Sequence, residues 1–414
     1  MSKLDNQPYR GTRDFKPASM RRQNHIFNTW FTICESFGYE EYMTPLLEPI
    51  ELYTSKTSEE IVNEQSYSFT DRGDRTLTIR PEMTPSVARL VSQDRLESGY
   101  PLRLFSMANF MRYERPQKGR LREFWQLNAD LFGDSNDYGD QEIITLADTL
   151  MQAFGATDDM YQVRISHRDV LNELADLAGA DDSAALTRLV DAHDKMSQAE
   201  FDEKLGELSA DKTVVGQFMQ ASSIDGLPPQ IQELSSVQHV SNIIERLDLD
   251  TVVFDQTIAR GFDYYTGMVF EVFDMNPDNK RSLFGGGRYD ALLENFGVDP
   301  LPTVGFGMGD ATLAEFLDGH ELWPELTPAA EIWVVVEDNV AQAEAAAMGL
   351  RAAGVNVAID YSGRKTDKQI KTALKHQIPY VLFPGSDDTH ALKQLDSGEQ
   401  SELTIEEIAD EISR

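Results

Sequence analysis

Hydrophobic positions follow a helical period in some segments of the chain and a strand-like pattern in others. Over residues 17–39 the apolar side chains recur at helical spacing and Gly38 ends the run, so the pattern predicts a helix there. Short apolar runs separated by turn residues, as in an antiparallel sheet, predict strands on both sides of a long central segment. These strands are expected at 77–80, 102–106, 123–132, 251–273 and 302–309.

Two other segments differ from the rest of the chain in composition and in the periodicity of their apolar residues, which predicts a division into domains. Between 157 and 250, Leu, Ala, Asp and Glu recur at helical spacing, which indicates a helical insertion. After a hinge containing Pro324 and Pro328, strand and helix patterns alternate, as in a small α/β domain. The predicted domains are a core of 1–156 and 251–325, a helical insertion domain of 157–250, and a C-terminal domain of 328–414.

Composition excludes several classes of protein. The chain is 41% hydrophobic and 26% charged, which is typical of a soluble globular protein, and no apolar run reaches the ~18–20 residues of a membrane helix. The polar, basic stretch Met1–Arg22 lacks the apolar segment of a secretory signal, so a cytoplasmic protein is expected. The single cysteine, Cys34, excludes an internal disulfide framework, and the seven histidines show no metal-ligand spacing. No structural metal is expected.

The charge of the chain is strongly negative but uneven. A net charge of −33 argues against non-specific nucleic-acid binding, because the field of the whole protein repels phosphate. Three basic segments interrupt the acidic background, at 1–22, 101–122 and 364–375. Each basic segment is either a local binding surface for a polyanion or an ordinary solvent-exposed surface.

The segment 110–124 carries the densest candidate chemistry. It reads as a strand, a basic loop with Pro-Gln-Lys-Gly at its tip, and a second strand, with arginines on both arms. The planar guanidinium group suits phosphate oxygens, and two arms of a hairpin can direct two such groups at one ligand. The pattern predicts a phosphate-binding hairpin, and the alternative is an exposed hairpin whose charges serve solubility.

Three more clusters are candidates for a binding site. In 80–85 a carboxylate and a hydroxyl, Glu82 and Thr84, follow a strand and can hold an ammonium group, although a charged turn has the same pattern. Segment 260–267 places an arginine and tyrosines beside glycines, as in a pocket wall or an aromatic core strand. The glycines of 284–290 allow close approach of a ligand to the backbone, or form a tight turn. Neither a Rossmann fingerprint nor a Walker A loop is present.

Together these segments resemble the histidyl-tRNA synthetases, which are class II aminoacyl-tRNA synthetases. Residues 38–48 resemble class II motif 1 with Pro45 as its proline, and 110–126 resemble motif 2. Segments 260–265 and 286–290 resemble two signatures peculiar to the histidine enzymes. The resemblance implies an α+β fold: an antiparallel sheet core flanked by helices, a helical insert and a C-terminal α/β anticodon-binding domain. It also implies a homodimer formed through motif 1.

The resemblance assigns roles residue by residue. Arg260 would be catalytic together with Arg112, as cations on the α-phosphate of ATP. Histidine would be bound by Glu82, Thr84, Gln126, Asp130, Tyr264, Tyr265 and Tyr289. ATP would be bound by Arg112, Glu114 and Arg120. The tRNA would meet Arg115 and Gln117 in the motif 2 loop and Arg364, Lys368, Lys371 and Lys375 in the last domain, where the lysines share one helical face.

The chain departs from the family pattern at two positions. Asp130 stands where the family usually has glutamate. Thr312 stands in motif 3 where the family has an arginine that clamps ATP, and residues 301–350 contain no lysine or arginine. Arg281 or Arg288 are candidates to take over that role.

Two functions follow from the resemblance. The first is an enzyme that activates histidine with ATP and Mg²⁺ and transfers it to tRNA(His). The second is a non-catalytic paralogue that binds histidine as the regulatory subunit of ATP phosphoribosyltransferase. Thr312 and the acidic surface favour the second function, whereas Arg260, the arginine pair Arg112 and Arg120, and the anticodon-type domain favour the enzyme.

Overall fold

The computed structural model describes residues 5–54, 65–94, 97, 99–193, 196–221, 223–256, 258, 265–279, 281–385 and 388–413. The chain forms two compact units. The first unit holds the chain up to Asp14 and Gln23–Trp323, and the C-terminal unit holds Phe15–Arg22 and Pro324–Arg414. No helix in the described part of the chain is long and apolar enough to cross a membrane.

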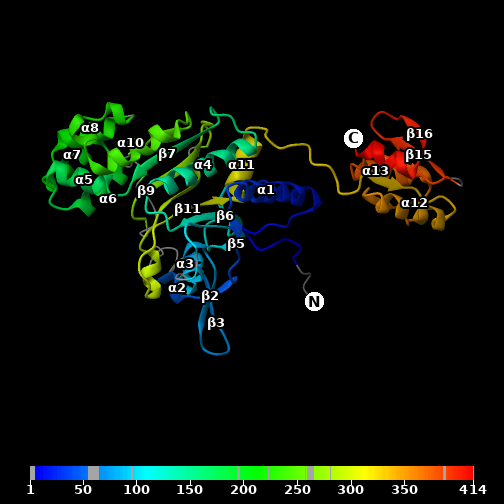
Figure 1. The fold of residues 1–414 in the computed structure, drawn as a ribbon, viewed down its shortest axis with the longest axis horizontal. Helices are drawn as coiled ribbons and strands as arrows, with labels where there is room; N and C mark the ends of the chain where they lie inside the picture. Colours follow the sequence, from blue (N-terminus) through cyan, green and yellow to red (C-terminus); the bar gives the residue numbers. More distant parts are fainter. Residues whose placement is uncertain are drawn as a thin grey trace. The chain divides into compact units, whose positions relative to one another are not determined.

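An eight-stranded sheet forms the framework of the first unit (Figure 1). Its strands in spatial order are β1 (Glu40–Glu41), β5 (Leu102–Met111), β6 (Glu123–Phe132), β11 (Thr303–Gly309), β10 (Ser282–Arg288), β9 (Met268–Asp274), β7 (Tyr161–His167) and β8 (Val252–Phe254). All interior pairs are antiparallel, and only the edge strands β1 and β8 pair in parallel with their neighbours. The expected antiparallel sheet core is confirmed.

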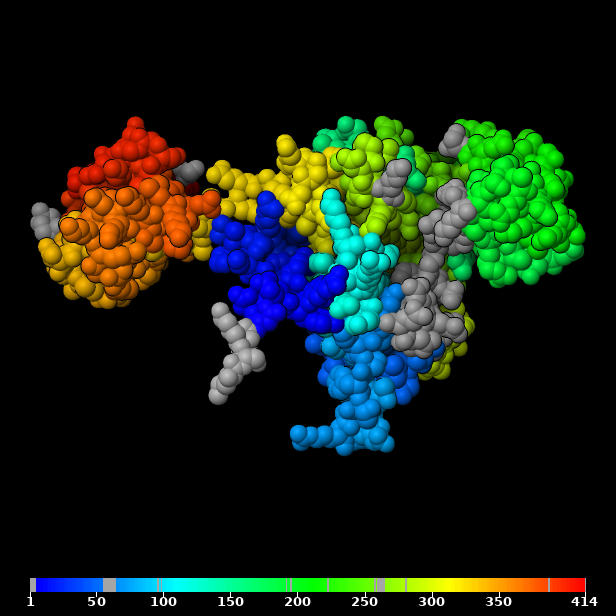
Figure 2. Space-filling model, turned by 180° about the vertical axis from the view of Figure 1, so that it is seen from behind, coloured from blue at the N-terminus to red at the C-terminus, as the bar shows by residue number. Residues whose placement is uncertain are grey.

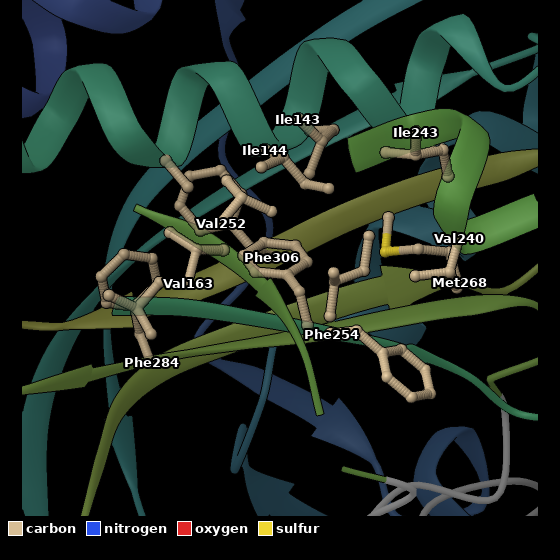
Figure 3. Packing of buried hydrophobic residues seen from close by; sticks show 14 of the residues in the cluster. Ile143, Ile144, Val163, Val240, Ile243, Val252, Phe254, Met268, Phe284 and Phe306 are labelled. Carbon is tan, nitrogen blue, oxygen red and sulfur yellow. The ribbon is translucent and has the colours of Figure 1, made fainter. Parts of the chain in front are cut away.

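Three helices cover one face of this sheet: α1 (Pro17–Ser36), α4 (Tyr138–Ala153) and α11 (Asp310–Gly319). Alternate residues of each strand point toward them because side chains of a strand alternate between its two faces. In β6 these are Leu127, Ala129 and Leu131, all buried in the main hydrophobic core. Figure 3 shows Ile143 and Ile144 of α4 in the same core as Phe306 of β11. The opposite face of the central strands is therefore left for a ligand.

The helical segment follows β7 and shares the core of the sheet. Its helices are α5 (Val170–Ala178), α6 (Ser183–Asp191), α7 (Gln198–Glu207), α8 (Lys212–Gln220), α9 (Pro229–Gln232) and α10 (Ser235–Leu247), with a 3₁₀ turn, η3 (Ile224–Gly226). Val240 and Ile243 of α10 pack into the main core, as Figure 3 shows. The helices predicted between 157 and 250 are confirmed. The first part of that range forms β7 of the main sheet, so the helices begin at Val170. The domain boundaries remain predictions.

A smaller three-stranded sheet precedes the motif 2 strands. Its order is β2 (Leu47–Pro49), β4 (Thr76–Ile79) and β3 (Tyr67–Thr70), followed by α3 (Thr84–Gln93); α2 (Glu51–Thr54) and the 3₁₀ helix η4 (Leu292–Phe296) lie near α3. The hairpin of β3 and β4 extends away from the main sheet in Figure 1, and it stands out in light blue in Figure 2. Residues 80–84 follow β4 directly and lie at the open face of the main sheet.

The C-terminal unit has its own five-stranded sheet, in the order β13 (Val357–Ile359), β12 (Ile332–Val334), β14 (Tyr380–Phe383), β15 (Thr389–Gln394) and β16 (Gln400–Thr404). Its helices are α12 (Val340–Ala352), α13 (Thr366–Lys375) and α14 (Ile405–Ile412). The alternation of strands and helices predicted after the hinge is confirmed, and β13, β12 and β14 pair in parallel. The antiparallel strands β15 and β16 were not predicted, because their residues are largely polar and partly exposed.

The glycine-rich segment 284–290 runs through the middle of the main sheet rather than forming a turn. A Cβ atom on Gly286 would overlap the backbone and side chain of β11, at Gly305 and Phe306. We expect Gly286→Ala to lower the free energy of unfolding by about 1–3 kcal/mol, because an overpacked core must shift the neighbouring strand. Gly216→Ala, where nothing lies within 4 Å of the added carbon in α8, should be neutral or stabilising. Equal denaturation midpoints for the two variants would contradict this account.

Candidate active site

A cavity of about 350 Å³ lies on the open face of the main sheet. It is lined by residues of four central strands and by the segment that leads into α3. Eight of the predicted site residues line it: Glu82, Thr84, Arg112, Arg120, Gln126, Asp130, Tyr265 and Tyr289. Residues that are 207 positions apart in sequence, from Glu82 to Tyr289, thus meet at one place.

The floor of the cavity comes from the alternation of β6. Gln126, Asn128 and Asp130 occupy every second position and so share one face of the strand. The residues paired with them on β11 are glycines, because Gly305 is opposite Asp130 and Gly307 is opposite Asn128. Side chains at these glycines would collide with Asp130 and Gln126. The glycines therefore make room for polar side chains to lie over the neighbouring strand.

Asp130 is the most unusual group in the cavity. Its side chain is buried, and the Tyr289 hydroxyl donates a hydrogen bond to Oδ1. Oδ2 has no hydrogen-bond partner among the described residues. Burial raises the pKa of Asp130 to about 7, against the lowering effect of the Tyr289 hydrogen bond. A buried, unsatisfied carboxylate oxygen is costly on its own, so the site is built to accept an N–H donor from a ligand.

Glu82 and Thr84 supply polar groups at another part of the wall. Both are buried, with exposed fractions of 4% and 8%. The segment is held in place by Arg80, whose guanidinium donates to the backbone oxygens of Thr44 at 2.9 Å and Asn109 at 3.0 Å. A carboxylate and a hydroxyl fixed in this way suit an ammonium group, as expected from the sequence.

Arg112 enters the cavity from the end of β5. Its Nε donates to the carbonyl oxygen of Pro81 at 2.9 Å, and its guanidinium carbon lies 5.6 Å from the centre of the Phe124 ring. These contacts orient the plane of the guanidinium group and leave its terminal nitrogens for a ligand. An arginine fixed through Nε and a ring face is a rigid anion-binding group.

A second cavity, of about 190 Å³, adjoins the first and shares Arg112, Arg120 and Gln126 with it. Glu114 lines this second cavity, together with the ring of Phe124. Arg120 lies 3.6 Å from the Glu114 carboxylate. A flat aromatic ring beside a carboxylate acceptor is suited to a nucleobase with an exocyclic amine.

The motif 2 loop turns tightly beside these cavities. Gln117 and Arg120 exchange two backbone hydrogen bonds of 3.0 Å each, and Gly119 takes the positive φ of +71° that the turn requires. The two residues expected to meet tRNA, Arg115 and Gln117, are exposed on this loop. The predicted strand–loop–strand is confirmed.

The two arginines considered for the role of the missing motif 3 arginine have different surroundings. Arg288 is buried and forms an ion pair with Asp140 at 2.8 Å, so its charge is already neutralised. Arg281 is exposed beside the motif 2 loop. The Thr312 hydroxyl donates to the carbonyl oxygen of Leu283 at 2.8 Å and offers no positive charge.

The Arg288 ion pair also bears on metal binding. Among the described residues, Asp137, Asp140 and His239 lie close enough together to hold a cation. The Arg288 guanidinium takes the place of such a cation beside Asp140. His239 itself lies 3.3 Å from Asp140 and links α10 to the start of α4.

The remaining predicted site residues fall into two groups. Arg260 and Tyr264 are outside the described residues. In the C-terminal unit, Arg364, Lys368 and Lys371 are all exposed, and the two lysines lie on α13.

Three polar residues that line the main cavity were not predicted as site residues: Asn128, Glu271 and Ser282. The period of two on β6 that connects Gln126 and Asp130 passes through Asn128 and was the available signal for it. Glu271 is the one charged residue in the apolar run 268–273, which was the available signal for that position. Ser282 carries no signal that distinguishes it in the sequence.

Comparisons with known proteins agree with this arrangement. A family model described as Histidyl-tRNA synthetase matches residues 11–313, and one described as Anticodon binding domain matches residues 330–414. A protein named Histidine--tRNA ligase from Leptospira biflexa is 38% identical over 99% of this chain and 98% of its own length. One of the same name from Thermococcus kodakarensis is 36% identical over 100% and 99%.

Solved structures share the fold. The crystal structure of histidyl-tRNA synthetase from Nostoc superposes with a TM-score of 0.83 and covers 100% of both chains, at 22% identity. A Bacillus halodurans structure titled as an ATP phosphoribosyltransferase regulatory subunit/histidyl-tRNA synthetase gives 0.75 at 25% identity, over 93% of this chain and 100% of the other. The chain therefore belongs to the histidyl-tRNA synthetase family of class II aminoacyl-tRNA synthetases, which are ATP-dependent ligases.

Proposed function

We propose that this chain joins histidine to ATP, forming histidyl-adenylate and pyrophosphate, and then transfers the histidyl group to tRNA(His). The observation that carries the proposal is the main cavity, which holds three kinds of group together. Asp130 offers an unsatisfied acceptor for an imidazole N–H, Glu82 and Thr84 suit the ammonium group, and Arg112 suits a phosphate.

The adenylation step needs positioning and charge more than proton transfer. The carboxylate of histidine is already ionised, and it attacks the α-phosphorus while pyrophosphate leaves. Arg112, and Arg260 by the same resemblance, would stabilise the negative charge that develops on the α-phosphate oxygens. The hydrogen bond from Arg112 to Pro81 fixes this charge before the substrate arrives.

A divalent cation accompanies ATP in ligases of this class, and we infer that it is Mg²⁺. Hard oxygen ligands are the groups that Mg²⁺ prefers, and it is normally held by phosphates and one or two carboxylates. The Glu271 carboxylate lines the main cavity, so it would hold the ion together with the phosphates. When bound, the ion would neutralise charge on the phosphates.

We infer that the chain works as a homodimer. Three large apolar side chains of the motif 1 segment, Met43, Leu46 and Leu47, are exposed, with fractions of 55%, 43% and 43%. Neighbouring exposed apolar side chains of this kind mark a surface that another protein covers. Molar mass by light scattering tests the inference. A cytoplasmic location is part of the same proposal, because ATP and tRNA are its substrates.

The lysines of α13 are expected to contribute to tRNA binding. Neutralising Lys368, Lys371 and Lys375 together should weaken tRNA(His) binding about tenfold or more and lower the slope of log K against log salt by about 2, because each phosphate contact releases a counterion. Histidine-dependent pyrophosphate exchange should not change, since that step uses no tRNA. Arg351→Ala, at an exposed position of α12 in the same unit, is the control. An unchanged salt slope would contradict the proposed tRNA face.

Charging of tRNA(His) transcript with labelled histidine tests the whole proposal. Acid-stable incorporation of histidine, and not of other amino acids, is the expected result. The regulatory-subunit function is less supported, because the relatives found at 33–38% identity over nearly the whole chain carry the name Histidine--tRNA ligase. A folded protein that binds histidine but charges no tRNA would favour that second function.

A further inference from the structure

A third cavity lies beside the motif 2 loop and continues the first two. Its volume is about 490 Å³, and three basic side chains line it: Lys118, Arg120 and Arg281. It shares Arg120 and Leu283 with both other cavities. A ligand that fills the first two cavities therefore has a basic space open beside it.

The Arg281 side chain is positioned but not neutralised. Its terminal nitrogens donate to the backbone oxygen of Lys118 and to Oε1 of Gln117, each at 3.1 Å. Both acceptors are uncharged, and they use two of the five N–H donors of a guanidinium group. Within the described part of the chain, no carboxylate oxygen lies within 4 Å of this guanidinium, in contrast to Arg288.

Two carboxylates, Glu271 and Glu315, line this cavity against the three basic side chains. Glu315 of α11 lies against the motif 2 loop, because a Cβ atom on Gly119 would come within 3.2 Å of its carboxylate. Burial raises the pKa of Glu315, while the charges of Lys118 and Arg281 act in the opposite direction. The side of the cavity formed by the loop and Arg281 thus keeps an excess of positive charge.

We propose that Arg281 binds the β- and γ-phosphates of ATP, with Arg120 and Lys118, and so supplies the cation that position 312 lacks. The α-phosphate would lie at Arg112, in the two adjoining cavities, and the pyrophosphate end would extend into the third. A planar guanidinium group that faces neutral oxygens can exchange them for phosphate oxygens without losing an ion pair. The inference rests on the proposed function, because it assumes ATP as the ligand.

Three substitutions separate a phosphate-binding role from a role in holding the loop. Arg281→Ala removes the charge and the two loop hydrogen bonds, Arg281→Gln keeps amide donors without charge, and Arg281→Lys keeps the charge. We expect the alanine and glutamine variants to raise the KM for ATP about 10- to 100-fold in pyrophosphate exchange, which corresponds to the loss of a charged hydrogen bond. The lysine variant should recover part of the loss, and the KM for histidine should stay within about twofold.

Binding of AMP distinguishes a role in binding the outer phosphates from a purely structural role of Arg281. AMP lacks the two outer phosphates, so its Kd should be the same for the wild-type protein and all three variants. Equal losses for AMP and ATP, recovery by glutamine, or no change in the KM for ATP would each overturn the inference. Arg75→Ala, on the exposed β3–β4 hairpin, is the matched arginine control. If wild-type protein shows no histidine-dependent exchange, the proposed function fails instead.

Discussion

Asp130→Asn is expected to weaken histidine binding while making the folded protein more stable at alkaline pH. Oδ2 of the buried carboxylate, which has no partner in the described part of the chain, would accept from the imidazole, and an asparagine offers no charge to that donor. Loss of a hydrogen bond to a charged group costs about 1.5–3 kcal/mol, so the KM for histidine should rise about 10- to 100-fold. The KM of the wild-type enzyme should rise as pH falls below 7, because burial raises the pKa of Asp130 to about 7.

The same substitution is expected to increase the stability of the folded protein, although it weakens histidine binding. The folded state holds the Asp130 proton more tightly than the unfolded state does, because the folded pKa is about 7 and the ordinary value is 3.8. As pH rises from about 4 to 7, Asp130 ionises in the unfolded state before it does so in the folded state, so the free energy of unfolding falls. Above pH 7 this loss of stability is complete. We expect Asp130→Asn to raise Tm at pH 8 and to have little effect near pH 4.5.

Melting curves of both proteins across this pH range provide the check on Asp130. Asp71→Asn, at a partly exposed aspartate of the β3–β4 hairpin, is the control, since the hydrogen bonds and charge of Arg75 lower the pKa of Asp71. A difference in Tm between wild type and Asp130→Asn that does not grow with pH would refute the raised pKa.

Arg112→Ala is expected to reduce the rate of histidyl-adenylate formation about 10²- to 10³-fold. Removing one preorganised group that stabilises transition-state charge costs about 2.7–4 kcal/mol in comparable sites. Histidine binding should persist, because Asp130 is held by Tyr289, and Arg80 still anchors the segment of Glu82 and Thr84. Arg112→Lys should rescue little, because an ammonium group cannot keep both the Pro81 hydrogen bond and the contact with Phe124.

Single-turnover adenylate formation and histidine affinity by calorimetry check this second prediction. The Arg75→Ala variant again serves as the arginine control. A rate within tenfold of wild type for Arg112→Ala would remove Arg112 from the proposed chemistry. A loss of histidine affinity as large as the loss of rate would show instead that Arg112 shapes the cavity.

Local structure was predictable where one face of an element is buried. The apolar alternation over 123–132 predicted β6 with the bounds the structure shows, and the spacing in 17–39 predicted α1. The strands β15 and β16 were not predicted, because most of their side chains are at least partly exposed and their sequences hold few apolar residues. A periodic pattern of apolar residues arises because one face of an element is buried, so the pattern is weak in strands that are largely exposed.

The site was predictable in its members but not in its geometry. The resemblance supplied Glu82, Arg112 and Asp130, whereas their meeting in one cavity depends on strand pairing between distant segments. The free oxygen and raised pKa of Asp130 come from burial, which a sequence does not record. The choice between Arg281 and Arg288 likewise required the ion pair of Arg288 with Asp140.

Histidine-dependent exchange of labelled pyrophosphate into ATP tests the central claim most directly. The account predicts exchange by the wild-type protein with histidine and not with other amino acids, and its loss in Arg112→Ala and Arg260→Ala. The assay should cover a wide range of salt, because a chain with a net charge of −33 is sensitive to ionic screening. Absence of exchange at every salt concentration, from protein shown to be folded, would contradict the claim.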